Sequence, residues 1–277
     1  MITLAAALRE TTGTGTSGLD RIDAEFLLAH VLAKPRAWLY AHADDLLAPE
    51  QLAAFRALLK RREGGEPVAY LTGQRGFWSL DLQVTADTLI PRPETERLVE
   101  LALAFVHPGR PAAVLDLGTG SGAVALAIAS ERPLSQVTAI DISPAALAVA
   151  AANGRRLHLG NVIFEHGDWF SSLGSRRFDI IVSNPPYIAD GDTHLGQGDL
   201  RFEPRSALAA GADGLDDIRI IVGDAPRHLL PGAWLLLEHG WNQGASVRGL
   251  LEAGGFTEIM TEPDLEGRDR VTLGRMV

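Results

Sequence analysis

The residues AVLDLGTGSG, at positions 113–122, decide the fold. Their apolar start predicts a short buried strand over 113–117, and the glycines that follow predict a tight turn into an alanine-rich helix over 123–130. Glycine lets the backbone come close to a ligand, and the start of the helix is expected to supply free N–H groups. The stretch therefore predicts a site for a nucleotide-like ligand, with a purely structural turn as the alternative.

Strands and helices alternate from this point almost to the last residue. Such alternation is typical of an α/β protein with a doubly wound, Rossmann-like sheet that carries helices on both faces. We expect strands at 113–117, 136–140, 161–165, 178–182, 233–238, 256–261 and 270–273. We expect helices at 123–130, at 144–153 with Ser143 as the N-cap, at 215–230 and at 243–253.

Residues 1–64 have a different pattern, in which apolar residues recur at helical spacing. Asp20 is a candidate N-cap, and the segment 13–18 is expected to connect the first two helices. Pro49 starts a further helix that Gly64 and Gly65 end. These features predict a small N-terminal helical bundle in front of the sheet.

The segment between these two parts favours a β-hairpin, because residues 77–84 alternate like a strand. A helix is then expected to begin at Pro91 and to run to about Phe105. The sequence thus predicts a helical domain over residues 1–72, a linking hairpin over 73–90 and a catalytic domain over 91–277.

Composition and charge exclude several classes of protein. The chain has no cysteine, so disulfide scaffolds and cysteine nucleophiles are ruled out, and its eight histidines show no metal-ligand spacing. No apolar run is long enough to span a membrane, and the first residues do not resemble a secretory signal, so we expect a cytoplasmic protein without a metal site. Residues 1–75 hold nine basic and nine acidic side chains, which leaves the whole net charge of −10 on residues 76–277 and disfavours a nucleic-acid substrate.

The glycine loop alone does not separate a dinucleotide from S-adenosylmethionine, because its spacing fits both. Asp141 ends the second expected strand, where an acidic side chain binds ribose hydroxyl groups. The acidic Asp116 beside the loop suits the ammonium group of S-adenosylmethionine better than the phosphates of a dinucleotide. Trp169 follows the third strand, where it would either stack on the adenine or cap the edge of the core. We therefore favour S-adenosylmethionine.

The tetrapeptide Asn184-Pro185-Pro186-Tyr187 leaves the carboxyl end of the fourth strand. Its two prolines stiffen the backbone and remove two N–H donors, so a row of carbonyl acceptors is expected to remain. The Asn184 side chain adds an acceptor, and Tyr187 offers an aromatic face. This arrangement suits a planar –NH₂ group on an sp² carbon, as in adenine, guanine or glutamine, whereas a turn that merely ends the strand is the structural alternative.

Further segments extend these motifs into a family pattern. They are Glu66–Gly73, Ile90–Glu96, Asp116–Gly122, Asp168–Phe170, Asn184–Ile188, Arg201–Pro204, Leu237–Trp241 and Arg270-Val271. With them the chain resembles, over nearly its whole length, the HemK/PrmC type of bacterial protein-(glutamine-N5) methyltransferases that act on peptide chain release factors.

The resemblance implies a role for each motif. The side-chain amide nitrogen of a glutamine in a Gly-Gly-Gln loop of a class I release factor would be methylated from S-adenosyl-L-methionine, and residues 1–72 would recognise that partner. It implies that the catalytic and substrate-binding residues are Asn184, Pro185, Pro186 and Tyr187. It implies that the cofactor-binding residues are Gly118, Thr119, Gly120, Ser121, Gly122, Asp141, Trp169 and Asn184.

Two other acceptors share the same loop chemistry. A sister family methylates a glutamine of a ribosomal protein, and other enzymes with such a loop methylate nucleic-acid bases. The segment 238–241 favours the release-factor type, and the chain lacks the basic face that a nucleic-acid substrate needs. A regulatory module that only binds the cofactor is disfavoured because the tetrapeptide at 184–187, which we call the acceptor loop, is intact.

Overall fold

The computed structural model describes residues 2–12 and 20–277. The chain forms two compact units, one of residues 1–74 with 197–202 and the other of residues 75–196 with 203–277. The expected connection at 13–18 lies outside the described residues. No helix in the described ranges is both long and apolar enough to cross a membrane.

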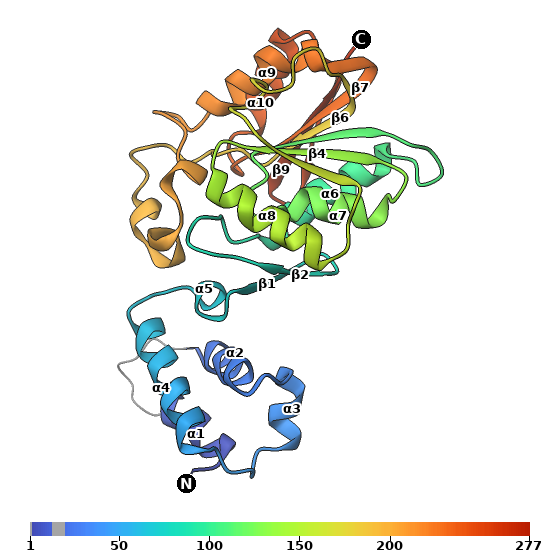
Figure 1. Ribbon diagram of the computed structural model, residues 1–277. Helices are drawn as coiled ribbons and strands as arrows, with labels where there is room; N and C mark the ends of the chain where they lie inside the picture. Colours follow the sequence, from blue (N-terminus) through green and yellow to red (C-terminus); the bar gives the residue numbers. More distant parts are fainter. Residues whose placement is uncertain (1, 13–19) are drawn as a thin grey trace. The chain divides into compact units, whose positions relative to one another are not determined.

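The first unit is a helical bundle, as the sequence predicts (Figure 1). Its helices are α1 (Leu4–Thr12), α2 (Arg21–Leu32), α3 (Arg36–Ala41), α4 (Pro49–Glu63) and α5 (Val68–Thr72). The expected N-cap is confirmed, because the Asp20 side chain accepts from the N–H of Ile22 at 3.0 Å. Leu27, Leu28 and Phe55 are among the buried residues of the core between these helices.

The expected β-hairpin is present as two short strands, and its turn lies inside the strand-like run over 77–84. β1 (Gln74–Phe77) and β2 (Leu80–Gln83) form a two-stranded sheet, with a turn at Trp78 and Ser79. Trp78 has a φ of 56°, and its N–H donates to Glu96 at 2.8 Å. The alternation of the sequence continues across the turn, which is why the pattern alone did not reveal it.

The second unit contains a seven-stranded sheet in the order β5-β4-β3-β6-β7-β9-β8. Its strands are β3 (Ala113–Leu117), β4 (Gln136–Asp141), β5 (Val162–His166), β6 (Phe178–Ser183), β7 (Leu229–Glu238), β8 (Thr257–Pro263) and β9 (Asp269–Arg275). From β5 to β7 neighbouring strands are parallel, and β9 is antiparallel to both β7 and β8. The sequence predicted the α/β class but not the antiparallel strand.

Helices cover both faces of this sheet, which confirms the doubly wound architecture (Figure 1). They are α6 (Glu96–Phe105), α7 (Ala123–Glu131), α8 (Pro144–Arg156), α9 (Asp216–His228) and α10 (Gly244–Ala253). Short 3₁₀ turns lie in the connections, namely η1 (Pro93–Thr95), η2 (Thr193–Gly196) and η4 (Arg205–Ala207), while η3 (Gly198–Phe202) belongs to the first unit. The expected cap of α8 is confirmed, because Ser143 accepts from the N–H of Ala146. The expected start of a helix at Pro91 shifts to the 3₁₀ turn at Pro93.

Alternate residues of the central strands enter different cores. Val114 and Ile180 pack with α6 and α7 on one face, whereas Leu115 and Ile181 pack with α9 and α10 on the other. Both faces are therefore apolar, and polar groups are left to the edge where the parallel strands end. In a doubly wound sheet this edge is where ligands bind.

Candidate active site

A cavity of about 370 Å³ opens at the carboxyl edge of the sheet. It is lined by the loops that follow β3, β4, β5 and β6 and by segments 86–89 and 204–207. Six of the residues expected at the site meet there, namely Gly118, Gly120, Asp141, Trp169, Asn184 and Pro186. A smaller cavity of about 50 Å³ adjoins the same glycine loop and includes Thr119 and Ser121.

The N–H groups of the glycine loop are largely used within the protein. Gly118 and Thr119 both donate to the carbonyl oxygen of Ile140 at 2.9 Å, and Gly122 donates to Thr119 at 2.8 Å. Gly120 donates to the Asp141 carboxylate at 2.7 Å. Four N–H groups of the loop thus have partners within the protein, and three of them donate to the neighbouring strand β4. Gly122 lines neither cavity.

Asp141 is held by the backbone at the end of β4. One carboxylate oxygen accepts from Gly120, and the other accepts from the N–H of Ser143 at 2.9 Å. Each carboxylate oxygen has a second lone-pair site, so both can still accept from hydroxyl groups in the cavity. The two backbone bonds fix the carboxylate at the wall of the large cavity.

Asp116 lies buried beside the smaller cavity. It accepts from the Thr119 hydroxyl at 2.6 Å and from the N–H of Ala125 at 3.2 Å. Burial raises the pKa of this carboxyl to about 7, against the effect of these two hydrogen bonds. Arg92 lines the same cavity, so one acidic and one basic side chain face a single small space.

Trp169 forms one wall of the large cavity. Its ring lies over Gly118, where an added β-carbon would stand 3.5 Å from the ring. Asp217 is a second cavity residue, and its pKa is raised by burial and by the nearby carboxylates Asp216 and Asp168.

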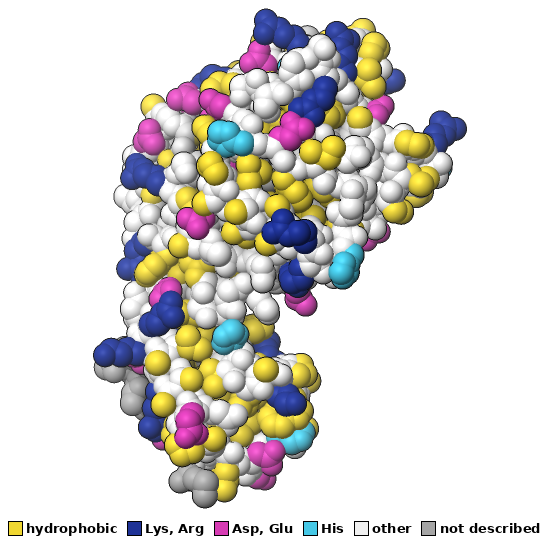
Figure 2. Space-filling view, viewed as in Figure 1, with side chains coloured by type: hydrophobic (Ala, Val, Ile, Leu, Met, Phe, Trp, Pro, Cys, Tyr) yellow, Lys and Arg dark blue, Asp and Glu magenta, His cyan; other side chains and the backbone are white. Residues whose placement is uncertain are grey.

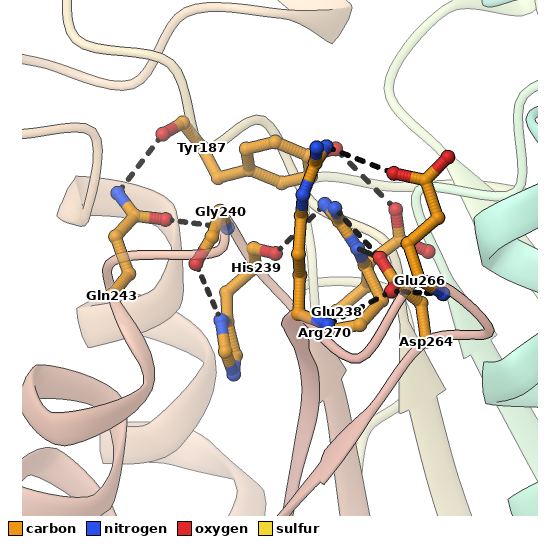
Figure 3. Close-up of polar contacts among 9 residues, drawn as sticks. Tyr187, Glu238, His239, Gly240, Gln243, Asp264, Glu266 and Arg270 are labelled. Carbon is orange, nitrogen blue, oxygen red and sulfur yellow. Dashed lines mark hydrogen bonds and ion pairs between the residues drawn. The ribbon is translucent and has the colours of Figure 1, made fainter.

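The four residues of the acceptor loop have different surroundings. Asn184 and Pro186 line the large cavity, whereas Pro185 and Tyr187 line neither cavity. The carbonyl oxygen of Tyr187 accepts from the Gln243 side chain at 3.0 Å, which takes this carbonyl out of the expected row of acceptors. Gln243 also accepts from the N–H of Gly240 at 2.8 Å, so it joins the acceptor loop to the segment after β7 (Figure 3).

A buried polar network stands behind the acceptor loop. The side-chain N–H₂ of Asn184 donates to the Thr95 hydroxyl at 3.1 Å, and both Thr95 and Glu238 are buried. The Tyr187 hydroxyl lies 3.4 Å from the Glu238 carboxylate (Figure 3). Burial raises the pKa of Glu238 to about 7 and raises that of Tyr187 as well.

Sequence reasoning assigned no role at the site to Arg92, Thr95, Asp217 or Gln243. Arg92 is paired with Glu203, which also accepts from the N–H of Ile90 at 3.0 Å. Segments quoted for the family resemblance contained Arg92, Thr95, Glu203 and Glu238, so a signal was present without a stated function. His239 is buried, and its ring nitrogens are hydrogen-bonded to the carbonyl oxygen of Gly240 at 2.9 Å and to the Thr272 hydroxyl at 2.7 Å.

The doubly wound sheet, the glycine loop and the loop of residues 184–187 together define the chain as a methyltransferase, and comparisons with known proteins agree. The methyltransferase small domain matches residues 100–200, and the PrmC N-terminal domain matches residues 4–73. Two solved structures share the fold, each at a TM-score of 0.54. One is a methyltransferase from Pyrococcus furiosus, which is 16% identical in sequence over 79% of this chain and 96% of that one. The other is a T. thermophilus 16S rRNA methyltransferase in complex with AdoMet and guanosine, which is 21% identical over 74% of this chain and 50% of that one.

Relatives along the full chain narrow this class. A release factor glutamine methyltransferase of Xylella fastidiosa is 56% identical over 94% of both chains. A protein of the same name from Vibrio cholerae is 52% identical over 99% of this chain and 97% of its own length. Another from Escherichia coli is 49% identical over 92% of both chains. The chain belongs to the release factor glutamine methyltransferase family.

Proposed function

We propose that the protein transfers a methyl group from S-adenosyl-L-methionine to the side-chain amide nitrogen of the glutamine in the Gly-Gly-Gln motif of class I peptide chain release factors. The observation that carries the proposal is that Asn184 and the glycine loop line one cavity. The acceptor amide and the methyl donor would therefore meet there. Because this partner acts in translation, we also propose that the protein works in the cytoplasm.

The two cavities suit S-adenosylmethionine better than a dinucleotide. A dinucleotide needs loop N–H groups for its pyrophosphate, and four of these groups already have partners in the protein. The smaller cavity instead offers Asp116 to an ammonium and Arg92 to a carboxylate, as a zwitterionic amino acid requires. Asp141 would bind the ribose hydroxyls and Trp169 would flank the adenine. When bound, S-adenosylmethionine supplies an electrophilic methyl group.

The acceptor loop would orient the glutamine for attack. With its N–H₂ directed to Thr95, Asn184 can turn its carbonyl oxygen to the acceptor amide. Accepting an N–H bond from that amide increases electron density on its nitrogen and aims the lone pair at the methyl group. The amide nitrogen can lose its proton after transfer, so no strong base has to act first. Pro186 and the backbone of this loop would hold the amide plane.

The relatives favour a release factor over the other two acceptors, a ribosomal-protein glutamine or a nucleic-acid base. All three full-length relatives described above are named for release factors. Basic and acidic side chains are also interspersed on the face shown in Figure 2, so that face offers no continuous basic track for a phosphate backbone.

The test is incubation of the protein with methyl-labelled S-adenosylmethionine and a purified class I release factor. Peptide mass spectrometry should place one methyl group on the glutamine of the Gly-Gly-Gln motif. A release factor in which that glutamine is replaced by alanine is the control and should remain unlabelled. Label on a ribosomal protein or on RNA, with none on the release factor, would reject the proposed substrate.

A further inference from the structure

We propose that Gln243 is a positioning residue for methyl transfer, because it holds the carbonyl oxygen of Tyr187 and so fixes where the acceptor loop places Asn184. The proposal rests on the proposed function, since it assigns a purpose to the geometry of that loop. Gln243 lines neither cavity, so it acts through the loop and not by contact with the cofactor.

The acceptor loop is anchored to the sheet at its start. Ser183, the last residue of β6, pairs with Leu117 on β3, and its hydroxyl donates to the Leu117 carbonyl oxygen at 2.8 Å. Asn184 follows directly, and the two prolines after it allow only a narrow range of φ. The position of Asn184 therefore also depends on where the loop ends, at Tyr187.

The peptide group between Tyr187 and Ile188 is held on both sides. Its N–H, on Ile188, donates to the carbonyl oxygen of Leu208 at 2.9 Å. Its carbonyl oxygen, on Tyr187, accepts from Nε2 of Gln243 at 3.0 Å. The first bond joins two backbone groups, whereas the second depends on the side chain of Gln243. Replacement of Gln243 should therefore release this end of the loop.

The Gln243 amide also contacts two turns beside the loop. Nε2 lies 3.2 Å from the carbonyl oxygen of Asp213 and 3.5 Å from that of Gly214, so its two protons face three carbonyl oxygens in all. Oε1 accepts from the N–H of Gly240 at 2.8 Å (Figure 3). The reversed amide would place an oxygen against the three carbonyl oxygens, so the surroundings determine its orientation.

Glycine residues stand on both sides of this amide. A β-carbon added to Gly214 would lie 3.0 Å from Nε2 of Gln243, and one added to Gly240 would lie 3.0 Å from Oε1. Both distances are shorter than an ordinary van der Waals contact, so the turns approach the amide this closely because they lack side chains. The amide is thus enclosed by the segments that it joins.

Gln243 and Gly240 are themselves fixed by the sheet. Gln243 is the N-cap residue of α10, which packs on one face of the sheet. The Gly240 carbonyl oxygen is hydrogen-bonded to the His239 ring at 2.9 Å, and the His239 N–H donates to the Arg270 carbonyl oxygen on β9 at 2.9 Å. The end of the acceptor loop is therefore tied to rigid elements through one side-chain amide.

The experiment compares Gln243→Met with Gln136→Met under saturating cofactor and release factor. Gln136 is a matched control, because its amide also donates to a backbone carbonyl, that of Asn161 at 2.9 Å, but lies at the amino ends of β4 and β5. Gln243→Met should lower kcat about 10- to 100-fold, the scale of a misplaced reacting group. Gln136→Met should keep the wild-type kcat. Calorimetry with S-adenosylhomocysteine should give the wild-type affinity for both variants.

Gln243→Glu supplies a readout that a merely structural role would not change. An ionised carboxylate cannot donate to the three carbonyl oxygens, whereas a protonated carboxyl has an O–H that can donate to Tyr187. Partial burial and the carbonyl oxygens should raise the pKa of the introduced carboxyl above its ordinary value. The kcat of Gln243→Glu relative to the wild type should therefore recover about tenfold as the pH falls from about 8 to about 5. Gln243→Met should show no recovery.

The titratable and charged groups around Gln243 are the same in the wild type and in the variants. They are Asp213, Tyr187, His239, Asp269 and Arg270. The hydrogen bond from Arg219 lowers the pKa of Asp213, and burial lowers the pKa of His239 and raises that of Tyr187. Division by the wild-type kcat at each pH removes the contributions of these groups.

An NMR measurement tests the contact without activity. The ¹⁵N signal of the Ile188 amide reports on the hydrogen bond to the Tyr187 carbonyl in the same peptide group. It should shift in Gln243→Met, and it should return toward its wild-type position in Gln243→Glu as the pH falls.

The outcomes separate the two proposals. A wild-type kcat in Gln243→Met, an equal loss in Gln136→Met, loss of S-adenosylhomocysteine binding in both Gln243 variants, or no recovery of Gln243→Glu at low pH would overturn the positioning role. Failure of the wild-type protein to methylate the release factor would instead overturn the proposed function. The Ile188 signal would still test the role of Gln243 in that case.

Discussion

Gly214 leaves no room for a side chain against the carbonyl oxygen of Tyr187, because a β-carbon added to it would overlap that oxygen. Gly214→Ala should therefore displace the acceptor loop and lower kcat about 10- to 100-fold, while S-adenosylhomocysteine still binds. Gly174→Ala is the matched control, since Gly174 also has a positive φ, of 58°, but has no atom within 4 Å of the added β-carbon. If kcat fell equally in both variants, the cause would be backbone strain at a positive φ and not displacement of the acceptor loop.

Asn184 is expected to be the residue on which turnover depends most. Asn184→Ala removes the side-chain acceptor and should lower the single-turnover rate about 100- to 1,000-fold, as does loss of one preorganised polar contact in other enzymes. Tyr187→Phe should be milder than Tyr187→Ala, because the long 3.4 Å contact to Glu238 is lost but the ring remains. A near-normal single-turnover rate for Asn184→Ala would make the loop structural.

Asp141→Ala should weaken the binding of S-adenosylhomocysteine by about 1–3 kcal/mol, the value of a hydrogen bond to a charged group. The comparison is Asp179→Ala, which removes a carboxylate that accepts from the N–H of Ala113 at 2.7 Å, at the opposite end of β3. Calorimetry should show the loss only in the first variant. Binding of NAD with comparable affinity by the wild-type protein would contradict the cofactor assignment.

Cofactor binding should depend on pH through Asp116. The pKa of this carboxyl is raised to about 7 in the free protein, and an adjacent ammonium favours its ionised form. The affinity for S-adenosylhomocysteine should therefore rise as the pH increases through about 7 and level off above it. Calorimetry at pH 6, in buffers of different ionisation enthalpy, should detect proton release on binding. Asp116→Asn should bind weakly, and without this proton release.

The first unit is expected to recognise the intact release factor through its exposed apolar residues. Ile22 and Phe26 lie four residues apart on α2 and are 49% and 45% exposed. Replacing both by serine should raise the KM for the folded release factor about tenfold or more, as expected for apolar residues central to an interface. Leu134→Ser, at a position 56% exposed in the second unit, should leave the KM unchanged. Equal KM values in all three proteins would exclude these residues from docking.

The parts of the fold that the sequence predicted correctly are those that local pattern determines. The strand at 113–117 and the caps at Asp20 and Ser143 depend on neighbouring residues, and the structure confirms all three. The glycine loop and Asp141 were correctly expected near one another, because parallel strands end at the same edge of a sheet.

The parts that were missed depend on pairing between distant residues. Thr95 and Asn184 are 89 residues apart, and Gln243 reaches Tyr187 across 56 residues. No periodicity or spacing relates such pairs, since the topology of the sheet alone brings them together. For the same reason, the use of the loop N–H groups by Ile140 became visible only in the folded chain.

Segment 197–202 has a consequence for any attempt to isolate the catalytic unit as a fragment. It comes from the second half of the chain but belongs to the first compact unit, where Asp199 pairs with Arg62 at 3.0 Å. A truncated protein that begins at Arg75 would keep Asp199 and lose its partner. A single cut therefore cannot divide this protein into its two units, and a working fragment would need residues 197–202 replaced by a short loop.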